Sequence, residues 1–231
     1  MHEDLERLDR LDRLDRDHFR QDLKIKELRS EHEALRATLG EQEAVLGARQ
    51  GAVDENATGQ RGLQRKLSDY RNSRASAVRL LETGQGDAEA AQRQIDRCEA
   101  LIDETETELL ELLEQADALE ALVSEASAAV AASRERLAQL DGSVPEEIAK
   151  LQASMASLTE QRRALIDTLP RELVSRYEHW RARGKWAVSR IVGKTCDACR
   201  MEVQPQHRSD LRRGRIAPCR GCHRYLIPDE G

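Results

Sequence analysis

Four cysteines near the end of the sequence form the clearest chemical pattern in the chain. They occur as two CxxC pairs in the segment "CDACRMEVQPQHRSDLRRGRIAPCRGC", residues 196–222, with nineteen residues between the pairs. A CxxC turn presents two thiolates to one side of a metal ion, and a second turn completes a tetrahedral site. The spacing therefore predicts one structural Zn²⁺ ion held by Cys196, Cys199, Cys219 and Cys222.

A pair of redox-active dithiols is the alternative interpretation of the same cysteines. Zinc is favoured because neither CxxC opens a helix in a βαβ unit. His207 and His223 are further candidate ligands, but four sulfurs already complete the site and leave zinc no position for a catalytic water. The sequence also shows no Ser–His–Asp set, phosphate-binding glycine loop or paired buried carboxylates, so we do not expect an enzyme.

The segment around the cysteines is strongly basic. From Arg171 onward there are 14 Lys/Arg and 7 Asp/Glu, a formal +7, whereas the whole chain carries −6 and residues 1–170 therefore −13. Compact positive charge favours contact with the phosphate backbone of RNA or DNA, and Tyr225, Trp186 or His223 would offer a stacking face. Alternatively, the arginines only solubilise the segment or pair with the acidic remainder. The candidate nucleic-acid-binding residues are Arg200, Arg208, Arg212, Arg213, Arg215, Arg220 and Arg224.

The remainder of the chain has the composition of long helices, with 35% charged and 3% aromatic residues. Apolar residues recur every seven positions in two long runs, as in the row that contains Ile95 and Ile102. The polar segment "ETGQGD", residues 82–87, separates the runs, and so short a connection folds two helices antiparallel. We expect a mostly α fold, with a coiled-coil hairpin over residues 1–169 and a connecting helix and zinc ribbon over residues 170–231.

Three local features modify this expectation. Four glycines and a weak apolar seam between Gly47 and Gly62 indicate a frayed or bent helix. A capping box and Pro145 in "LDGSVPEEIAKL" predict a break near residues 141–145. In the opening "LERLDRLDRLDR", leucines every three residues drift around a helix, so Leu5 and Leu8 either widen the seam, which is favoured, or face a second partner.

Three segments match one sequence pattern: "LPRELVSRYEHWRAR", "AVSRIVGKTCDACRMEV" and "IAPCRGCHRYLIP". The chain resembles a bacterial family of coiled-coil proteins that end in a C4-type zinc ribbon. That family has a Leu-Pro-x-x-Leu-x-x-x-Tyr helix, a strand entering C-x-x-C-x-M, and a final C-x-x-C-G-R-hydrophobic segment. His223 stands where the family has Gly. The matching residues are Leu169, Pro170, Leu173, Tyr177, Cys196, Cys199, Met201, Cys219, Cys222, Arg224 and Leu226.

The resemblance implies a non-enzymatic hairpin that carries a zinc ribbon. It also implies either nucleic-acid binding or an adaptor role for regulatory proteins, such as a sigma-54 transcription factor or flagellar and secretion components. The start of the sequence has no apolar signal-peptide region and no segment is long and apolar enough to span a membrane, so we expect a cytoplasmic protein. The sequence leaves the oligomeric state open.

Overall fold

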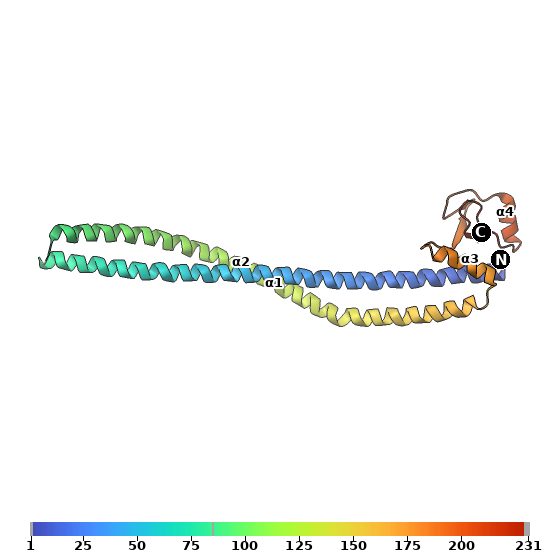
Figure 1. Cartoon of the computed structure of the whole chain (residues 1–231), viewed down its shortest axis with the longest axis horizontal. Coiled ribbons are helices and arrows are strands. Elements are labelled where there is room, and N and C mark those ends of the chain that lie inside the picture. Colours follow the sequence, from blue (N-terminus) through green and yellow to red (C-terminus); the bar gives the residue numbers. More distant parts are fainter. Residues whose placement is uncertain (1, 85, 229–231) are drawn as a thin grey trace. The chain divides into compact units, whose positions relative to one another are not determined.

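The computed structural model describes residues 2–84 and 86–228 (Figure 1). The mostly α fold and the long helical hairpin expected from the sequence are confirmed. None of the described helices is long and apolar enough to cross a membrane. The elements are α1 (Glu3–Thr83), α2 (Ala88–Ile166), α3 (Arg171–Arg181), β1 (Val188–Val192), β2 (Thr195–Cys196), α4 (Pro205–Arg212) and β3 (Tyr225–Ile227).

The chain forms two compact units. The head unit comprises the chain up to Glu31 together with everything from Gly142 onward, and the arm unit is His32–Asp141. These units divide the chain at positions other than the predicted boundary between residues 169 and 170. The C-terminal segment packs with the ends of both long helices, so those helix ends belong to the head unit.

The arm unit is an antiparallel pair of helical segments joined by the predicted turn. Gly84 and Gly86 have φ values of 65° and 102°, a left-handed conformation that glycine adopts without steric cost. Gln85 lies outside the described residues. The Asp87 carboxylate accepts hydrogen bonds at 3.0 and 3.3 Å from the backbone N–H groups two and three residues later, which caps α2. The buried seam includes Leu63, Leu67, Ala77, Ile95, Cys98, Ile102, Ala126 and Val130.

The expected fraying between Gly47 and Gly62 is wrong, because α1 is a continuous helix there. Polar contacts replace the missing apolar seam: the Asn56 side-chain amide donates a hydrogen bond of 3.0 Å to the backbone carbonyl of Leu112 in α2. A Cβ atom at Gly59 would lie 3.1 Å from the Leu112 side chain. The glycine therefore gives α2 room to approach α1 at this point.

The expected break near residues 141–145 is also wrong, because α2 continues through Pro145. Proline lacks the N–H that would bond the carbonyl of Asp141, and an interior proline costs a helix about 3 kcal/mol. The adjacent Val144 is buried, and tertiary packing of this kind outweighs local helix propensity. The predicted position nevertheless coincides with the division between the arm unit and the head unit.

The first turns of α1 form one wall of the hydrophobic core of the head unit. Leu5, Leu8 and Leu11 have no exposed surface. The favoured interpretation, that Leu5 and Leu8 widen the coiled-coil seam, is therefore wrong. They face a second partner, which is the chain's own C-terminal segment, in one cluster with Leu169, Tyr177, Ala187, Val188, Ile191, Cys196, Val203, Leu211, Cys219, Tyr225, Leu226 and Ile227.

Buried aspartates on α1 bind the same segment through hydrogen bonds. Asp15, which is 7% exposed, accepts a bond of 2.8 Å from the Tyr177 hydroxyl and one of 2.7 Å from Arg162 Nε. Arg181 of α3 donates a third bond to it at 3.2 Å. Burial and the neighbouring carboxylates raise the pKa of Tyr177, so its hydroxyl remains a donor. Asp15 thus ties α1 to α2 and α3.

A three-stranded sheet completes the head unit. The strand order is β2-β1-β3, with β2 antiparallel and β3 parallel to β1. Ile191 lies opposite Cys196 on one side of β1, and Val188 lies opposite Tyr225 on the other. Because one cysteine pair begins in β2 and the other directly precedes β3, pairing both strands with β1 brings the two CxxC pairs together.

We predict that Leu8→Ala destabilises the head unit by roughly 2–5 kcal/mol, because it leaves a cavity in a fully buried contact. Both tryptophans, Trp180 and Trp186, lie in the head unit, so tryptophan fluorescence during denaturant unfolding reports its free energy of unfolding. Leu23→Ala on the same helix is the matched control: Leu23 is 42% exposed, so its change should stay within about 0.5 kcal/mol. Equal, small effects of the two substitutions would contradict the packing described for α1.

Candidate metal centre

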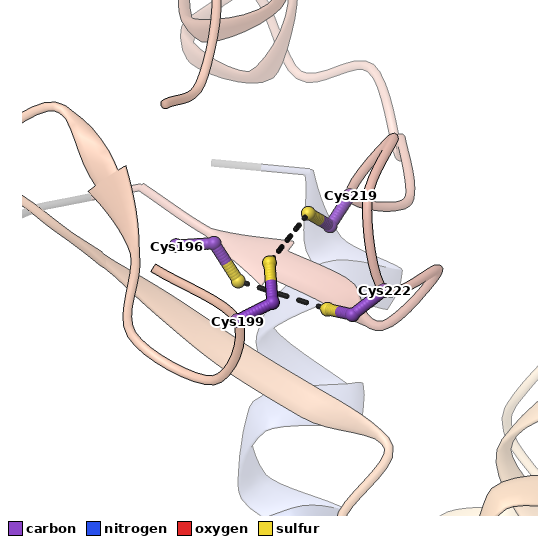
Figure 2. A group of neighbouring side chains, drawn as sticks. All are labelled: Cys196, Cys199, Cys219 and Cys222. Carbon is purple, nitrogen blue, oxygen red and sulfur yellow. Dashed lines mark hydrogen bonds between the residues drawn. The ribbon is translucent and has the colours of Figure 1, made fainter. Parts of the chain in front are cut away.

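The four cysteine sulfurs lie together in the head unit (Figure 2). All four Sγ atoms are within 4.8 Å of one another. The Sγ atoms of Cys196 and Cys222 are 3.7 Å apart, and so are those of Cys199 and Cys219. Each close contact therefore joins one CxxC pair to the other, and all four thiols are free. This group could hold one metal ion.

The two CxxC turns have equivalent backbone hydrogen bonds. The N–H of the first cysteine donates to the carbonyl five residues later, at 2.9 Å from Cys196 and 2.7 Å from Cys219. The carbonyl of the same cysteine accepts a bond from the N–H four residues later, at 2.8 and 2.9 Å respectively. These bonds close each turn and fix the positions of its two cysteines.

Both turns place a non-glycine residue in the left-handed region directly after their second cysteine. Arg200 has a φ of 62° and His223 a φ of 59°. An L-residue there costs about 1–2 kcal/mol, and such backbone strain persists only where the surrounding structure imposes it. His223, which stands in place of the glycine of the resembling family, itself adopts the left-handed conformation, and the second turn keeps the same backbone hydrogen bonds as the first.

The thiols differ in how readily they ionise. Burial opposes ionisation of Cys196, but the Ser189 hydroxyl and the backbone N–H groups of Cys199 and Ala198 outweigh it and lower the pKa to about 7. The Ser189 hydroxyl lies 3.3 Å from Cys196 Sγ. For Cys199, the backbone N–H of Met201 favours the thiolate, but burial and the neighbouring sulfurs raise the pKa to about 12. Four adjacent thiolates therefore require a cation among them.

Two of the seven predicted arginines are built into the protein's own packing. Arg224 Nε donates a bond of 2.8 Å to the carbonyl of Trp186, and its guanidinium lies 5.2 Å from the centre of the Trp180 ring. Arg220 donates a bond of 2.8 Å to the Gln204 side chain. Part of the hydrogen-bonding capacity of each of these guanidinium groups is therefore used within the protein.

Two further arginines form surface ion pairs. Arg200 pairs with Asp197 at 3.4 Å, and Arg215 pairs with Asp210 at 3.5 Å. Both arginine side chains are more than 70% exposed. Exposed pairs of this kind contribute about 0–1 kcal/mol, so a stronger anion can replace the aspartate.

The remaining three arginines lie in or directly after α4. Arg208, Arg212 and Arg213 make no hydrogen bond or ion pair through their side chains with any residue in the described ranges 2–84 and 86–228. Arg212 and Arg213 are exposed, and Arg208 is half-buried. The structure thus separates three available cations from four that have internal partners.

Two of the three aromatic residues expected to offer a stacking face are covered. The guanidinium of Arg16 lies 4.4 Å from the ring centre of Trp186, and that of Arg181 lies 4.2 Å from it. Tyr225 is only 2% exposed. His223 alone of the three is exposed, so base stacking has little support in this structure.

Two features of the head unit were not predicted from the sequence. Helix α4 has Pro205 in its first turn and buries His207 and Leu211 four residues apart, a signal that the basic composition of the segment obscured. The second feature is the buried aspartate row of α1. Its signal was the Leu-Asp-Arg repeat, in which the aspartates follow the drifting leucines around the helix.

Comparisons with solved structures support the fold. CT398 from Chlamydia trachomatis matches with a TM-score of 0.76 at 18% identity, covering 98% of both chains. A protein from Mycobacterium smegmatis matches with a TM-score of 0.69 at 21% identity, over 98% of this chain and all of that one. HP0958 from Helicobacter pylori matches with a TM-score of 0.60 at 14% identity, over 99% and 98%.

Sequence comparisons give a family. Two curated relatives from Mycobacterium tuberculosis, the uncharacterised proteins MT2288 and Rv2229c, are each 27% identical over 158 residues. The match spans 66% of this chain and 64% of the length of each relative. The model of the CT398-like coiled coil hairpin domain matches residues 5–185, which is most of the sequence. The chain therefore belongs to the CT398-like coiled coil hairpin family.

Proposed function

We propose that this chain is a non-enzymatic regulatory protein whose zinc-stabilised head binds the phosphate backbone of RNA or DNA. The observation that carries the proposal is the group of three arginines at α4, Arg208, Arg212 and Arg213. Their side chains have no partner among the described residues, and they lie in the same head unit as the four-cysteine cluster. Phosphate contacts need available cations more than they need base-reading side chains. The covered faces of Trp186 and Tyr225 agree with backbone binding that is not sequence-specific.

Zinc is the ion we assign to this group, because closed sets of four thiolates are a usual site of structural zinc. In a regular tetrahedron with Zn–S bonds of about 2.3 Å, neighbouring sulfurs are about 3.8 Å apart. Two of the sulfur separations, at 3.7 Å, are close to this value, and all four sulfurs lie within 4.8 Å of one another. Four thiolates carry −4, and a bound Zn²⁺ ion would reduce this to −2 and join the two CxxC turns. The cysteines hold the ion, which supplies structural stability and no open position for a substrate.

We predict one zinc ion per purified chain, and loss of that ion in Cys199→Ser. Without zinc the head unit should lose several kcal/mol of its free energy of unfolding, since structural zinc sites contribute directly to folding. Metal analysis gives the stoichiometry, and tryptophan fluorescence during denaturant unfolding gives the stability.

Cys98→Ser is the matched control, because Cys98 lies in the seam of the arm unit and should not change the zinc content. A purified chain without zinc, or a head unit equally stable after chelation, would contradict the metal assignment. Release of zinc by mild peroxide with formation of disulfides would favour the redox alternative instead.

The nucleic-acid proposal predicts a specific loss in the triple substitution Arg208→Ala, Arg212→Ala, Arg213→Ala. Affinity for a single-stranded oligonucleotide should fall. The slope of log affinity against log salt should shrink by roughly two, because each arginine–phosphate pair that the substitution removes accounts for about 0.7 of it. Filter binding at several salt concentrations measures both quantities.

The control for this prediction replaces three arginines of the arm unit, Arg61, Arg65 and Arg79, with alanine. It removes the same charge from the chain but leaves α4 unchanged, so the affinity should stay close to that of the wild type. An equal loss of affinity in both variants would indicate general electrostatic attraction to the chain. Affinity that does not depend on salt would contradict the proposal.

Exposed leucines of the arm unit favour a second function, that of a protein adaptor. Leu110 is 61% exposed and Leu113 is 44% exposed on α2, where a coiled coil normally carries polar residues. These side chains would fit the apolar face of a partner helix, such as one of a transcription or secretion component.

For the adaptor function we predict that Leu110→Ser with Leu113→Ser abolishes co-purification of a partner protein that survives nuclease treatment. The double substitution should leave the free energy of unfolding within about 0.5 kcal/mol, because both side chains are exposed. A partner that instead disappears on nuclease treatment, or disappears only in the triple arginine variant, would support the nucleic-acid function.

A further inference from the structure

A cavity of about 430 Å³ lies in the head unit between α1, β1 and the first CxxC turn. Its lining includes Asp9, Asp12, Arg13 and Arg16 from α1 and Arg190 from β1. The volume falls within the range of about 300–1,000 Å³ that small-molecule sites occupy. Of the seven predicted nucleic-acid-binding arginines, Arg224 lines this cavity, whereas the three that carry the proposed function, Arg208, Arg212 and Arg213, do not.

Charges in this cavity are layered, with carboxylates behind and guanidinium groups in front. The Asp9 and Asp12 side chains are 8% and 5% exposed, whereas those of Arg13, Arg16 and Arg190 are 60%, 40% and 50% exposed. A ligand that enters the cavity therefore meets the guanidinium groups first. The whole lining has four arginines and three aspartates, a formal charge of +1.

The buried carboxylates hold these guanidinium groups in place. Asp9 accepts a bond from Arg13 and bonds of 2.8 and 3.2 Å from Arg190, and Asp12 accepts a bond of 2.5 Å from Arg16 Nε. A guanidinium has five N–H donors, so each arginine keeps donors for a ligand. Arginines oriented in this way are suited to an oxyanion, because less side-chain entropy is lost when it binds.

One buried carboxylate oxygen of the cavity lining lacks a well-formed hydrogen bond. No described residue donates a bond of good geometry to Asp12 Oδ1, although the backbone N–H of Val188 acts on this carboxylate. Burial also raises the pKa of Asp12. A buried carboxylate oxygen without a well-formed hydrogen bond is costly, and a hydroxyl group brought by a ligand would supply that bond.

From this arrangement we infer that the cavity binds a phosphate monoester that carries hydroxyl groups. The phosphate dianion contacts Arg13, Arg16 and Arg190, and a ligand hydroxyl donates to Asp12. The cavity is larger than a bare phosphate ion needs, which leaves room for a nucleoside. The ligand is a free nucleotide or the terminal 5′-phosphate of an RNA strand, and only the second form rests on the proposed nucleic-acid function.

Calorimetric titration of the zinc-loaded full chain with AMP tests the cavity directly. We expect saturable binding at one site per chain, and a loss of affinity of roughly tenfold or more in Arg13→Gln, the effect of removing a charged hydrogen-bond donor. Arg20→Gln is the matched control, because Arg20 lies on the same helix and pairs with Asp17 outside the cavity. No AMP binding, or equal binding by Arg13→Gln and the wild type, overturns the inference.

One short RNA sequence with either a 5′-phosphate or a 5′-hydroxyl distinguishes the two ligand sources. Tighter binding of the phosphorylated form that disappears in Arg13→Gln identifies the RNA end. Equal binding of both forms, with AMP still bound, identifies the free nucleotide. The triple arginine variant at α4 separates the two proposals: it should weaken both RNAs and leave AMP binding unchanged. If AMP binds but neither RNA does, the nucleic-acid function fails and the cavity assignment stands.

Discussion

The head unit depends on the burial of one stripe of α1 against the C-terminal segment. Leu5, Leu8 and Leu11 are completely buried there, and Asp15 beside them bonds α3 through Tyr177. Burying a leucine side chain contributes about 1.5–3 kcal/mol, so three leucines outweigh the cost of placing aspartates nearby, provided each carboxylate has donors. The small sheet therefore obtains a core that its own short strands could not supply.

The same stripe separates the part of the fold that could be predicted from the sequence from the part that could not. The hairpin, its turn and the CxxC pairs are local or periodic features: the heptads, the glycines beside Gln85 and the cysteine spacing all lie in short stretches of sequence. The roles of Leu5 and Leu8 depend on a segment more than 160 residues away. The pattern of three-residue steps indicated a second face but could not identify what covers it.

The two predictions about interruptions failed for a related reason. Pro145 and the glycines between Gly47 and Gly62 have poor local propensity for a helix interior. Helix α2 nevertheless continues beside a buried Val144, and α1 continues where Asn56 bonds the opposite backbone. Local signals describe an isolated helix, whereas each of these helices is fixed by interactions outside the local sequence. Gly59 has two opposite effects: it lowers the local helix propensity of α1, but it also lets α2 approach α1 closely at Leu112.

The arginines of the head unit have different structural roles, which the composition of the segment does not reveal. The sequence presents the arginines of this segment as one basic patch, but buried aspartates orient Arg181 and Arg190, and Arg224 packs on Trp180. A guanidinium bonded by one edge retains donors on the other, so a structural ion pair and an anion site can share one side chain. Positive charge in this head is therefore divided into three groups: arginines that hold the fold, arginines held by buried carboxylates at a cavity, and arginines at α4 whose side chains have no partner in residues 2–84 and 86–228. Only the arginines at α4 resemble the diffuse patch that the net charge suggests. The arginines at the cavity and those at α4 both keep N–H donors that could bond a phosphate group.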